Sequence, residues 1–345
     1  MPWRLALMSI CALCCCVGTD SSWARPVHIR GTAYEFNNTR VRLAGATVHV
    51  AERPRIRATV ARNGSYDLVV PDRASITLYI TAAGYHTIYL QTFRTAGENL
   101  ARVNFQTPTE SIYRALATLL DVPLDENGDL RQCGIVSTFS TRNVRDLSFG
   151  GFTAYGAHGV AGATASATPA LPQPVYFNEN VIPDPLQELS SADGGVVWTR
   201  VPAGVFRITA HHPSTRFASF VATCKPGRVV NANPPWGLHE LGKRNTAKVS
   251  LIWTGTQLRR LRVYDLPPRA TVLLSCTGKG CPFRRRNTDL GATRRKIRAG
   301  QTLEVRVTAH AYDGKLVRYR LRRGQPASAV TRCVPLGNTK PRSRC

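Results

Sequence analysis

Apolar and polar residues alternate with a period of two along much of this chain. The alternation is clear in residues 41–50, 76–81 and 302–309. A period of two is typical of strands that bury one face of an antiparallel sheet. Short runs of this kind, separated by turns rich in Gly, Pro, Asn and Asp, predict an all-β protein built from antiparallel β-sandwiches.

One turn-and-strand pattern occurs twice. It consists of Thr-Ala-Tyr, then Ala-Gly-Ala-Thr, then a polar turn followed by two strand-like runs. The pattern begins at Thr32 in the first copy and at Thr153 in the second, and its polar turns are Asn63-Gly64 and Asp193-Gly194. A repeated pattern of this length indicates two copies of one structural unit. We therefore expect two β-sandwiches in tandem, with the same strand order.

One segment departs from the strand period. Residues 109–122 place apolar side chains at helical spacing, with Thr109 as a plausible N-cap and Glu110 in the first turn. An apolar stripe needs a partner, so we expect this linking helix to pack between or beside the sandwiches. The stripe consists of Ile112, Ala115, Leu116, Leu119 and Leu120.

The patterns divide the chain into five segments. In order, these are a signal peptide (1–24), a first β-sandwich (26–107), a helical linker (108–132), a second β-sandwich (133–241) and a basic, disulfide-bonded β module (243–345). The second sandwich carries an extra stretch, residues 169–189, with five prolines. We expect this insertion to be a surface loop, and the sequence does not show whether it recognises a partner.

The first 24 residues have the features of a secretory signal peptide. Arg4 supplies a positive start, an apolar run follows, and Ser22-Trp23-Ala24 forms a small-x-small cleavage site. The run of about 13 residues is too short to span a bilayer. We expect a secreted, extracellular protein without a transmembrane segment, either free or associated with the cell surface.

Six cysteines follow the signal peptide, and an even number in an exported chain indicates disulfides. One pair brackets the second sandwich, another flanks a turn with two glycines that permit a short closed loop, and the third follows by elimination. A four-thiolate zinc site is the alternative for the last four, although their spacing differs from common zinc ribbons. The expected pairs are Cys133–Cys224, Cys276–Cys281 and Cys333–Cys345.

Positive charge is concentrated at the C-terminal end. Of the net charge of +25, residues 243–345 contribute +21, from 25 Lys and Arg against 4 Asp and Glu. Such a unit attracts polyanions through long-range fields and counterion release, so its binding should weaken steeply as salt rises. The plainer interpretation is solvated arginine on strand faces. The densest clusters, which we expect to bind polyanions, are Arg284, Arg285, Arg286, Arg294, Arg295 and Lys296.

Several short motifs of the first sandwich occur together in one known family. They are Gly31, Ala44-Gly45-Ala46-Thr47-Val48, Asn63-Gly64-Ser65-Tyr66, Val70-Pro71 and Ala83-Gly84-Tyr85. In these motifs the sandwich resembles a carboxypeptidase regulatory-like domain of the transthyretin (prealbumin) fold, in secreted proteins of high-GC bacterial type. The second sandwich resembles it more loosely. The resemblance implies non-catalytic modules of exported and surface proteins.

Catalytic motifs are absent from the sequence: there is no nucleophile elbow, P-loop, dinucleotide fingerprint or zinc-protease helix. His211 and His212 are adjacent on a predicted strand and point to opposite faces, so they do not suit one metal ion. The acidic turn at residues 125–129 lacks the full spacing of a calcium loop. The carboxylates of residues 178–188 lie in the proline-rich insertion, without a supporting scaffold. We expect no enzymatic activity, no cofactor and no metal site.

These observations favour a secreted, non-catalytic binding or scaffolding protein at the cell envelope. Its basic C-terminal module would hold an anionic envelope polymer or polysaccharide. No specific nucleic acid is expected, because no interleaved aromatics or nucleic-acid motif accompany the charge, and the oligomeric state is open. The alternative is a secreted carbohydrate-binding or carbohydrate-processing protein that uses four aromatic side chains as stacking platforms: Trp198, Tyr176, Phe177 and Trp236.

Overall fold

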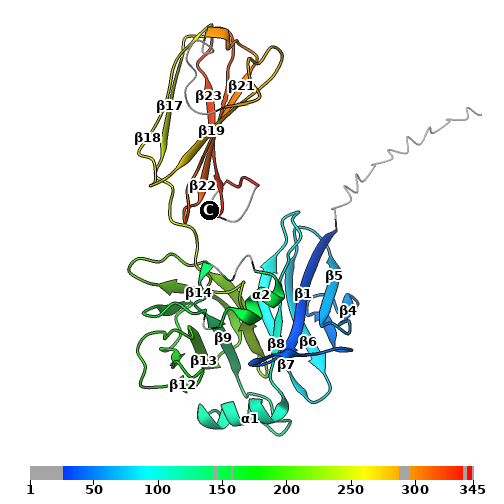
Figure 1. Cartoon of the computed structure of the whole chain (residues 1–345). Helices are drawn as coiled ribbons and strands as arrows, with labels where there is room; N and C mark the ends of the chain where they lie inside the picture. The colour runs from blue at the N-terminus through cyan, green and yellow to red at the C-terminus, as the bar shows by residue number, and fades with distance from the viewer. Residues whose placement is uncertain are drawn as a thin grey trace, which may run out of the picture.

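The computed structural model describes residues 26–142, 144, 147–156, 158–286, 295–336 and 340–343. Strands dominate it, and the chain is an all-β protein as predicted. Two sandwiches stand side by side, and the C-terminal module rises from the second one (Figure 1). Neither α-helix in the described part of the chain has the length and apolar character needed to cross a bilayer.

The first sandwich packs a four-stranded sheet against part of a larger one. In the four-stranded sheet, β1 pairs antiparallel with β2 and β5 and parallel with β8. In the facing layer the order is β7-β6-β3-β4. The strands are β1 (Val27–Glu35), β2 (Asn38–Arg42), β3 (Thr47–Val50), β4 (Arg57–Thr59), β5 (Ser65–Val70), β6 (Ser75–Ala82), β7 (Tyr85–Arg94) and β8 (Phe105–Thr107).

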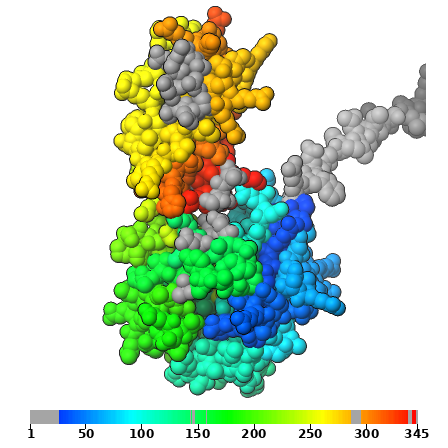
Figure 2. Space-filling model, viewed as in Figure 1, coloured from blue at the N-terminus to red at the C-terminus, as the bar shows by residue number. Residues whose placement is uncertain are grey.

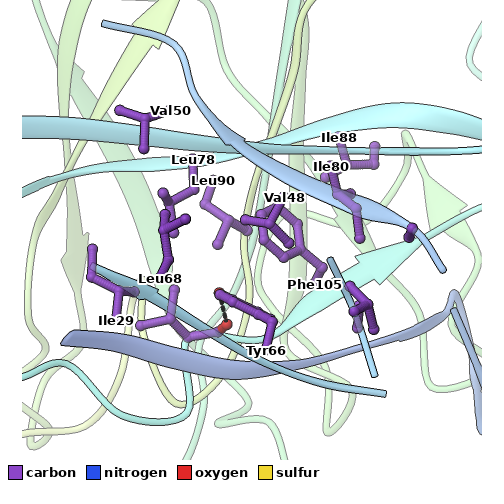
Figure 3. Close-up of a cluster of buried hydrophobic side chains, with 14 of the residues drawn as sticks. Ile29, Val48, Val50, Tyr66, Leu68, Leu78, Ile80, Ile88, Leu90 and Phe105 are labelled. Carbon is purple, nitrogen blue, oxygen red and sulfur yellow. Dashed lines mark hydrogen bonds between the residues drawn. The ribbon is translucent and has the colours of Figure 1, made fainter. Parts of the chain in front are cut away.

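Alternate side chains of these strands meet in the core of the first sandwich (Figure 3). Ile29 and Leu68 come from one layer, and Leu78 and Ile80 come from the other; each of the four is at most 1% exposed. The hydroxyl of Tyr66 donates a hydrogen bond to the backbone carbonyl of residue 103, so the one polar atom of this buried ring is satisfied. The predicted alternation is therefore the pattern of the core.

The second sandwich repeats the strand pairing of the first. β9 pairs with β13 as β1 does with β5, and β10-β14-β15 matches β3-β6-β7. β16 runs parallel to β9 as β8 runs parallel to β1. The predicted repeat is confirmed in these pairings. The strands are β9 (Cys133–Thr138), β10 (Thr164–Thr168), β13 (Gly195–Val201), β14 (Gly204–His211), β15 (Phe220–Cys224) and β16 (Val229–Ala232).

One part of the predicted repeat is wrong. The glycines of the two Ala-Gly-Ala-Thr turns, Gly45 and Gly162, share the same φ of 81° and precede equivalent strands. The two Thr-Ala-Tyr segments differ, because the first lies in β1 and the second lies at the end of a short helix, α2 (Phe149–Ala154). Ser148 caps this helix, and the Phe149 ring packs 5.1 Å from the Tyr34 ring of the first sandwich. The counterpart of β1 is β9.

The two sandwiches share one sheet of nine strands, which the sequence patterns did not predict. Its order is β12-β11-β13-β9-β16-β7-β6-β3-β4, so β16 joins the second sandwich to the first. β16 pairs parallel with β9 on one side and with β7 on the other. All four of its residues are buried.

Part of the proline-rich insertion lies within this sheet, whereas a surface loop was expected for the whole stretch. It supplies β11 (Val175–Phe177) and β12 (Pro183–Asp184), which extend the nine-stranded sheet at one edge. The Tyr176 ring is buried, and its hydroxyl accepts a hydrogen bond from the Ala165 amide at 3.1 Å. The strands β11 and β12 are three and two residues long. Alternation over so few residues does not distinguish a strand from a loop.

Helix α1 (Glu110–Leu119) begins where it was predicted, since the Thr109 hydroxyl accepts a hydrogen bond from its first turn at 3.3 Å. Its buried face differs from the predicted stripe. Tyr113 and Ala117 are buried, whereas Ala115 and Leu119 are exposed. Side chains of α1 and of β7, β16, β9 and β13 line one apolar cavity of about 90 Å³. The helix therefore covers the junction of the two sandwiches.

A buried histidine lies under this helix. The His86 ring is 4% exposed and stacks on Tyr113 with the ring centroids 3.4 Å apart. Its Nδ1 lies 3.4 Å from a Glu110 carboxylate oxygen, and its Nε2 lies 3.8 Å from one of Asp129. Burial is the largest influence on the pKa of His86 and lowers it, while the two carboxylates act in the opposite direction. The folded state therefore favours the neutral imidazole.

Two predicted disulfides are confirmed. Cys133 and Cys224 join β9 to β15 with a Cα–Cα separation of 5.6 Å, which links the two layers of the second sandwich. Cys276 and Cys281 close the short turn with a Cα–Cα separation of 5.8 Å. Cys345 lies outside the described residues, so its pairing with Cys333 stays a prediction.

The C-terminal module is a third, smaller sandwich. A two-stranded sheet, β17-β18, faces a five-stranded sheet of order β20-β19-β21-β22-β23 over a separate apolar core. The strands are β17 (Lys248–Trp253), β18 (Leu258–Tyr264), β19 (Thr271–Thr277), β20 (Arg285–Arg286), β21 (Thr302–Thr308), β22 (Gly314–Arg320) and β23 (Ser328–Val334).

The module is attached to the second sandwich through the Asp313 carboxylate, which is 5% exposed. Arg216 of the second sandwich lies 3.4 Å from this carboxylate and donates to the Gly242 carbonyl at 2.7 Å. Lys243 and Tyr312 form a parallel bridge beside it. Only the carboxylate of this ion pair is buried, since the Arg216 side chain is 38% exposed. The pair fixes geometry, because an unpaired carboxylate in this position would be costly.

Gly31 provides a test of the first sandwich. An added Cβ would lie 1.7 Å from the Val103 carbonyl oxygen, so the backbone would have to move. We expect Gly31→Ala to lower the free energy of unfolding by about 2 kcal/mol or more. Gly150→Ala is the matched control: a Cβ at that position meets nothing within 4 Å, and alanine suits a helix. Chemical denaturation checks both, and equal stabilities for the two variants would contradict the packing described.

His86 predicts the direction of the acid response. Below the ordinary histidine pKa of about 6.5, the unfolded chain takes up a proton that the folded state resists, so stability should fall as pH drops through this value. We expect His86→Gln to reduce this loss between about pH 7.5 and about pH 5. A smaller loss should remain, because burial also lowers the pKa of His49 and His158. Thermal denaturation across this pH range measures the loss of stability, with His211→Gln as an exposed control. The same loss in His86→Gln as in the unmodified chain would contradict the attribution to His86.

Candidate binding surfaces

Strand alternation in the C-terminal module places arginines on the outer face of its larger sheet. Leu274, Val305 and Val317 are aligned across β19, β21 and β22 and point into the core. In each of these strands, the residues directly before and after the core residue point outward. We call these outward cations the basic sheet face: Arg285, Arg306, Arg318, Arg320 and Arg332.

The smaller sheet of the module carries cations as well. In the β17–β18 pair, Ser250 lies opposite Arg262 and Ile252 lies opposite Arg260, while Val249 and Val263 pack toward the core. Arg260 and Arg262 are exposed. The module therefore presents positive charge on both outer faces. This arrangement follows from the same period of two that builds its core.

The acidic groups described in the module are already engaged. Asp265 lies 2.8 Å from Lys248 and raises the pKa of that lysine. Glu304 accepts two hydrogen bonds from Arg318, at 2.8 and 3.1 Å. Asp313 pairs with an arginine of the second sandwich. These carboxylates therefore offset few of the remaining cations, and the surface potential stays strongly positive.

The segments beginning at residues 295 and 302 lie at the end of the module farthest from the sandwiches, where the orange part of the chain is seen (Figure 1). Gln301 connects the loops of this end. It is 2% exposed, accepts from the Arg298 amide at 2.9 Å and donates to the Lys279 carbonyl at 3.1 Å. Arg284, Arg285, Arg295 and Lys296 are exposed, and Arg294 lies outside the described residues. Arg286 belongs to β20.

A cleft lies where the first sandwich, the second sandwich and the chain end meet. Its volume is about 620 Å³, and it is lined by the end of β7, by β14 and β15, by Trp236 and by Arg342. Figure 2 shows the red end of the chain beside the cyan part of the first sandwich, where Arg342 forms an ion pair with Glu98 at 2.5 Å. We call this feature the junction cleft.

Three of the four aromatic platforms proposed for carbohydrate are not available to a ligand. Trp198, Tyr176 and Phe177 are each at most 6% exposed, because they belong to strands covered on both faces. Trp236 is partly buried and lines the junction cleft. The four residues therefore do not form one platform.

The other candidate side chains have local structural roles. His211 hydrogen-bonds Ser166, while His212 accepts from the backbone of the following turn, so the two rings act separately. Asp125 accepts from two amides of its own turn, and Asp184 accepts from the Leu186 amide. Within the described ranges, no group of three or more His, Cys, Asp or Glu is arranged to hold a metal ion.

Comparisons with known proteins do not place the chain in a family. No protein-family model matches it, and no curated protein matches it in sequence. Among solved structures it is similar to the streptococcal ancillary pilin (8% identity, TM-score 0.21, 90% of this chain and 95% of that one). It is also similar to the Bacillus anthracis TIE protein (12% identity, TM-score 0.19, 90% of this chain and 48% of that one).

A third structure is an N-terminal interface mutant of the type II cohesin–X–dockerin complex from Acetivibrio cellulolyticus. The identity is 18% and the TM-score is 0.20, over 24% of this chain and 58% of that one. The chain thus spans about half of the length of two of these three structures. At such scores, the similarities carry no argument about what this protein does.

Proposed function

We propose that this protein is a secreted, non-catalytic binding protein of the cell envelope whose C-terminal module holds an anionic polymer. One observation carries the proposal: the basic module presents arginines on both outer faces and at its far end, while its described carboxylates are already paired. Repeated contacts with a flexible polyanion would release counterions and give affinity without a shaped pocket.

The two sandwiches support a scaffolding role in this proposal. They are joined by a continuous sheet and carry the module at one side (Figure 1). We also propose that they are related to carboxypeptidase regulatory-like domains, which they resemble in sequence motifs. This resemblance supports a non-enzymatic role. Disulfides such as Cys133–Cys224 support export, because such bonds persist in oxidising compartments.

The proposal is tested by measuring the affinity of the full chain for immobilised poly(glycerol phosphate) and polygalacturonate at increasing salt concentration. Three sets of Gln substitutions are compared, each removing three charges. The sets are the module end (Arg284, Arg295, Lys296), the basic sheet face (Arg306, Arg320, Arg332) and a control on the first sandwich (Arg53, Arg55, Arg57).

We expect both module sets to weaken binding at low salt and to reduce the slope of log affinity against log salt by roughly one per lost contact. The control set should change little, and none should unfold the protein, because exposed charges contribute little to stability. No binding by the unmodified chain at low salt, or an equal loss in the control set, would contradict the proposal. An equal loss in the control set would mean that the total charge of the protein, and not the C-terminal module, determines binding.

A further inference from the structure

The wall of the junction cleft contains a β-bulge. In the β6–β7 pair, Thr77 lies opposite Thr92 and Tyr79 lies opposite Tyr89, so two residues of β7 face the single residue Leu78. Bulges re-aim side chains and are over-represented next to functional sites. The extra residue at this bulge is Gln91, which follows the core residue Leu90.

Gln91 has a polar side chain that the protein does not satisfy. The residue is 4% exposed and lines the junction cleft. Its side-chain amide makes no hydrogen bond within the described part of the chain. The amide remains accessible from the surface. An amide offers two donors and an acceptor, and at Gln91 these are open to a ligand from the cleft side. Such a group in a cleft wall indicates a polar ligand.

The aromatic part of the cleft is held in a fixed orientation. The indole Nε1 of Trp236 donates to the Ala101 carbonyl at 3.1 Å, and the Phe93 ring meets the indole edge-on at 5.4 Å. Phe220 also lines the cleft. A partly exposed indole whose nitrogen is already bonded contributes apolar ring atoms to the cleft, which suits a weakly polar surface of a ligand.

The rim of the cleft is positively charged. Arg94, Arg207 and Arg342 line it, and all three are exposed. Glu98 is the one carboxylate among the lining residues, and it is paired with Arg342. Arg207 is held by the hydroxyl of Ser219 at 3.1 Å. Guanidinium groups bind carboxylates in a bidentate manner, so the rim selects for an anionic group of this geometry.

We infer that the junction cleft binds a carboxylate-bearing sugar, with its ring on Trp236, its hydroxyls at Gln91 and its carboxylate at the arginine rim. A volume of about 620 Å³ is in the range of small-ligand sites and accommodates one or two sugar rings. The site is built by all three parts of the chain and lies apart from the outer faces of the module. The inference does not rest on the proposed polymer binding.

The test uses α-1,4-linked trigalacturonate as the probe, with calorimetric titration of the full chain. Maltotriose is the neutral counterpart with the same linkage. We expect trigalacturonate to bind with one site per chain and maltotriose to bind at least about tenfold more weakly. Gln91→Met and Arg207→Gln should each weaken trigalacturonate binding about five- to tenfold. Arg73→Gln is the matched control, since Arg73 is an exposed arginine of the first sandwich outside the cleft.

No binding of trigalacturonate, equal binding of maltotriose, or an equal loss in Arg73→Gln would overturn the inference. If Gln91→Met fails to fold, Arg207→Gln still decides, because its side chain is exposed on β14. The two sets of module substitutions should leave trigalacturonate binding unchanged. Failure of the cleft and failure of the polymer-binding module are therefore distinguishable.

Discussion

The parallel pairing of β16 with β7 and β9 is the interaction on which the rest of this structure depends. β16 is four residues long, and every one of them is buried. Without it, the first sandwich would end at β7 and the second at β9, as two separate bodies. With it, the backbone hydrogen bonds run without interruption through nine strands. Buried backbone groups must be paired, so the sheet holds both sandwiches in one relative orientation.

This constraint also shapes the surfaces between the sandwiches. Below the junction, α1 covers β7, β16 and β9 with an apolar face. Above it, β16 ends at Ala232 and the chain leaves toward Trp236, while β15 stays close to β7 through a 2.6 Å contact between Thr92 and Thr223. The junction cleft lies between the β7–β15 contact and the segment that leads to Trp236. A rigid sheet can hold Gln91 and Trp236 at a constant separation, which a flexible linker between two domains would not do.

The sequence was most informative where structure is local. Alternation predicted the cores, the paired Ala-Gly-Ala-Thr turns predicted equivalent strands, and Thr109 predicted the start of α1. Cys133 and Cys224 were paired correctly because they bracket one sandwich. The Thr-Ala-Tyr repeat misled, because a tripeptide carries no information about whether a capping serine and a neighbouring ring convert it into a helix.

The parts that were not predicted depend on contacts between distant segments. Parallel pairing of β16 with β7 leaves no local signature in four buried residues. The bulge at Gln91 exists only relative to β6, so no pattern within β7 identifies it. Three of the four aromatic residues proposed as sugar platforms are buried, because exposure cannot be judged from residue type when a strand is covered on both faces. Arginines on strand faces were anticipated from the sequence, but their presence on both outer faces of the C-terminal module was not.

Hydrogen exchange of the backbone amides in β16 tests the central claim most directly. If β16 holds both sandwiches as one body, the amides of Val230 and Asn231 should open only with global unfolding, with the same free energy as those of Ile88 in β7 and Ile135 in β9. Exchange of the β16 amides at rates typical of exposed loops, while β7 and β9 remain protected, would show that the sandwiches are not joined through this strand.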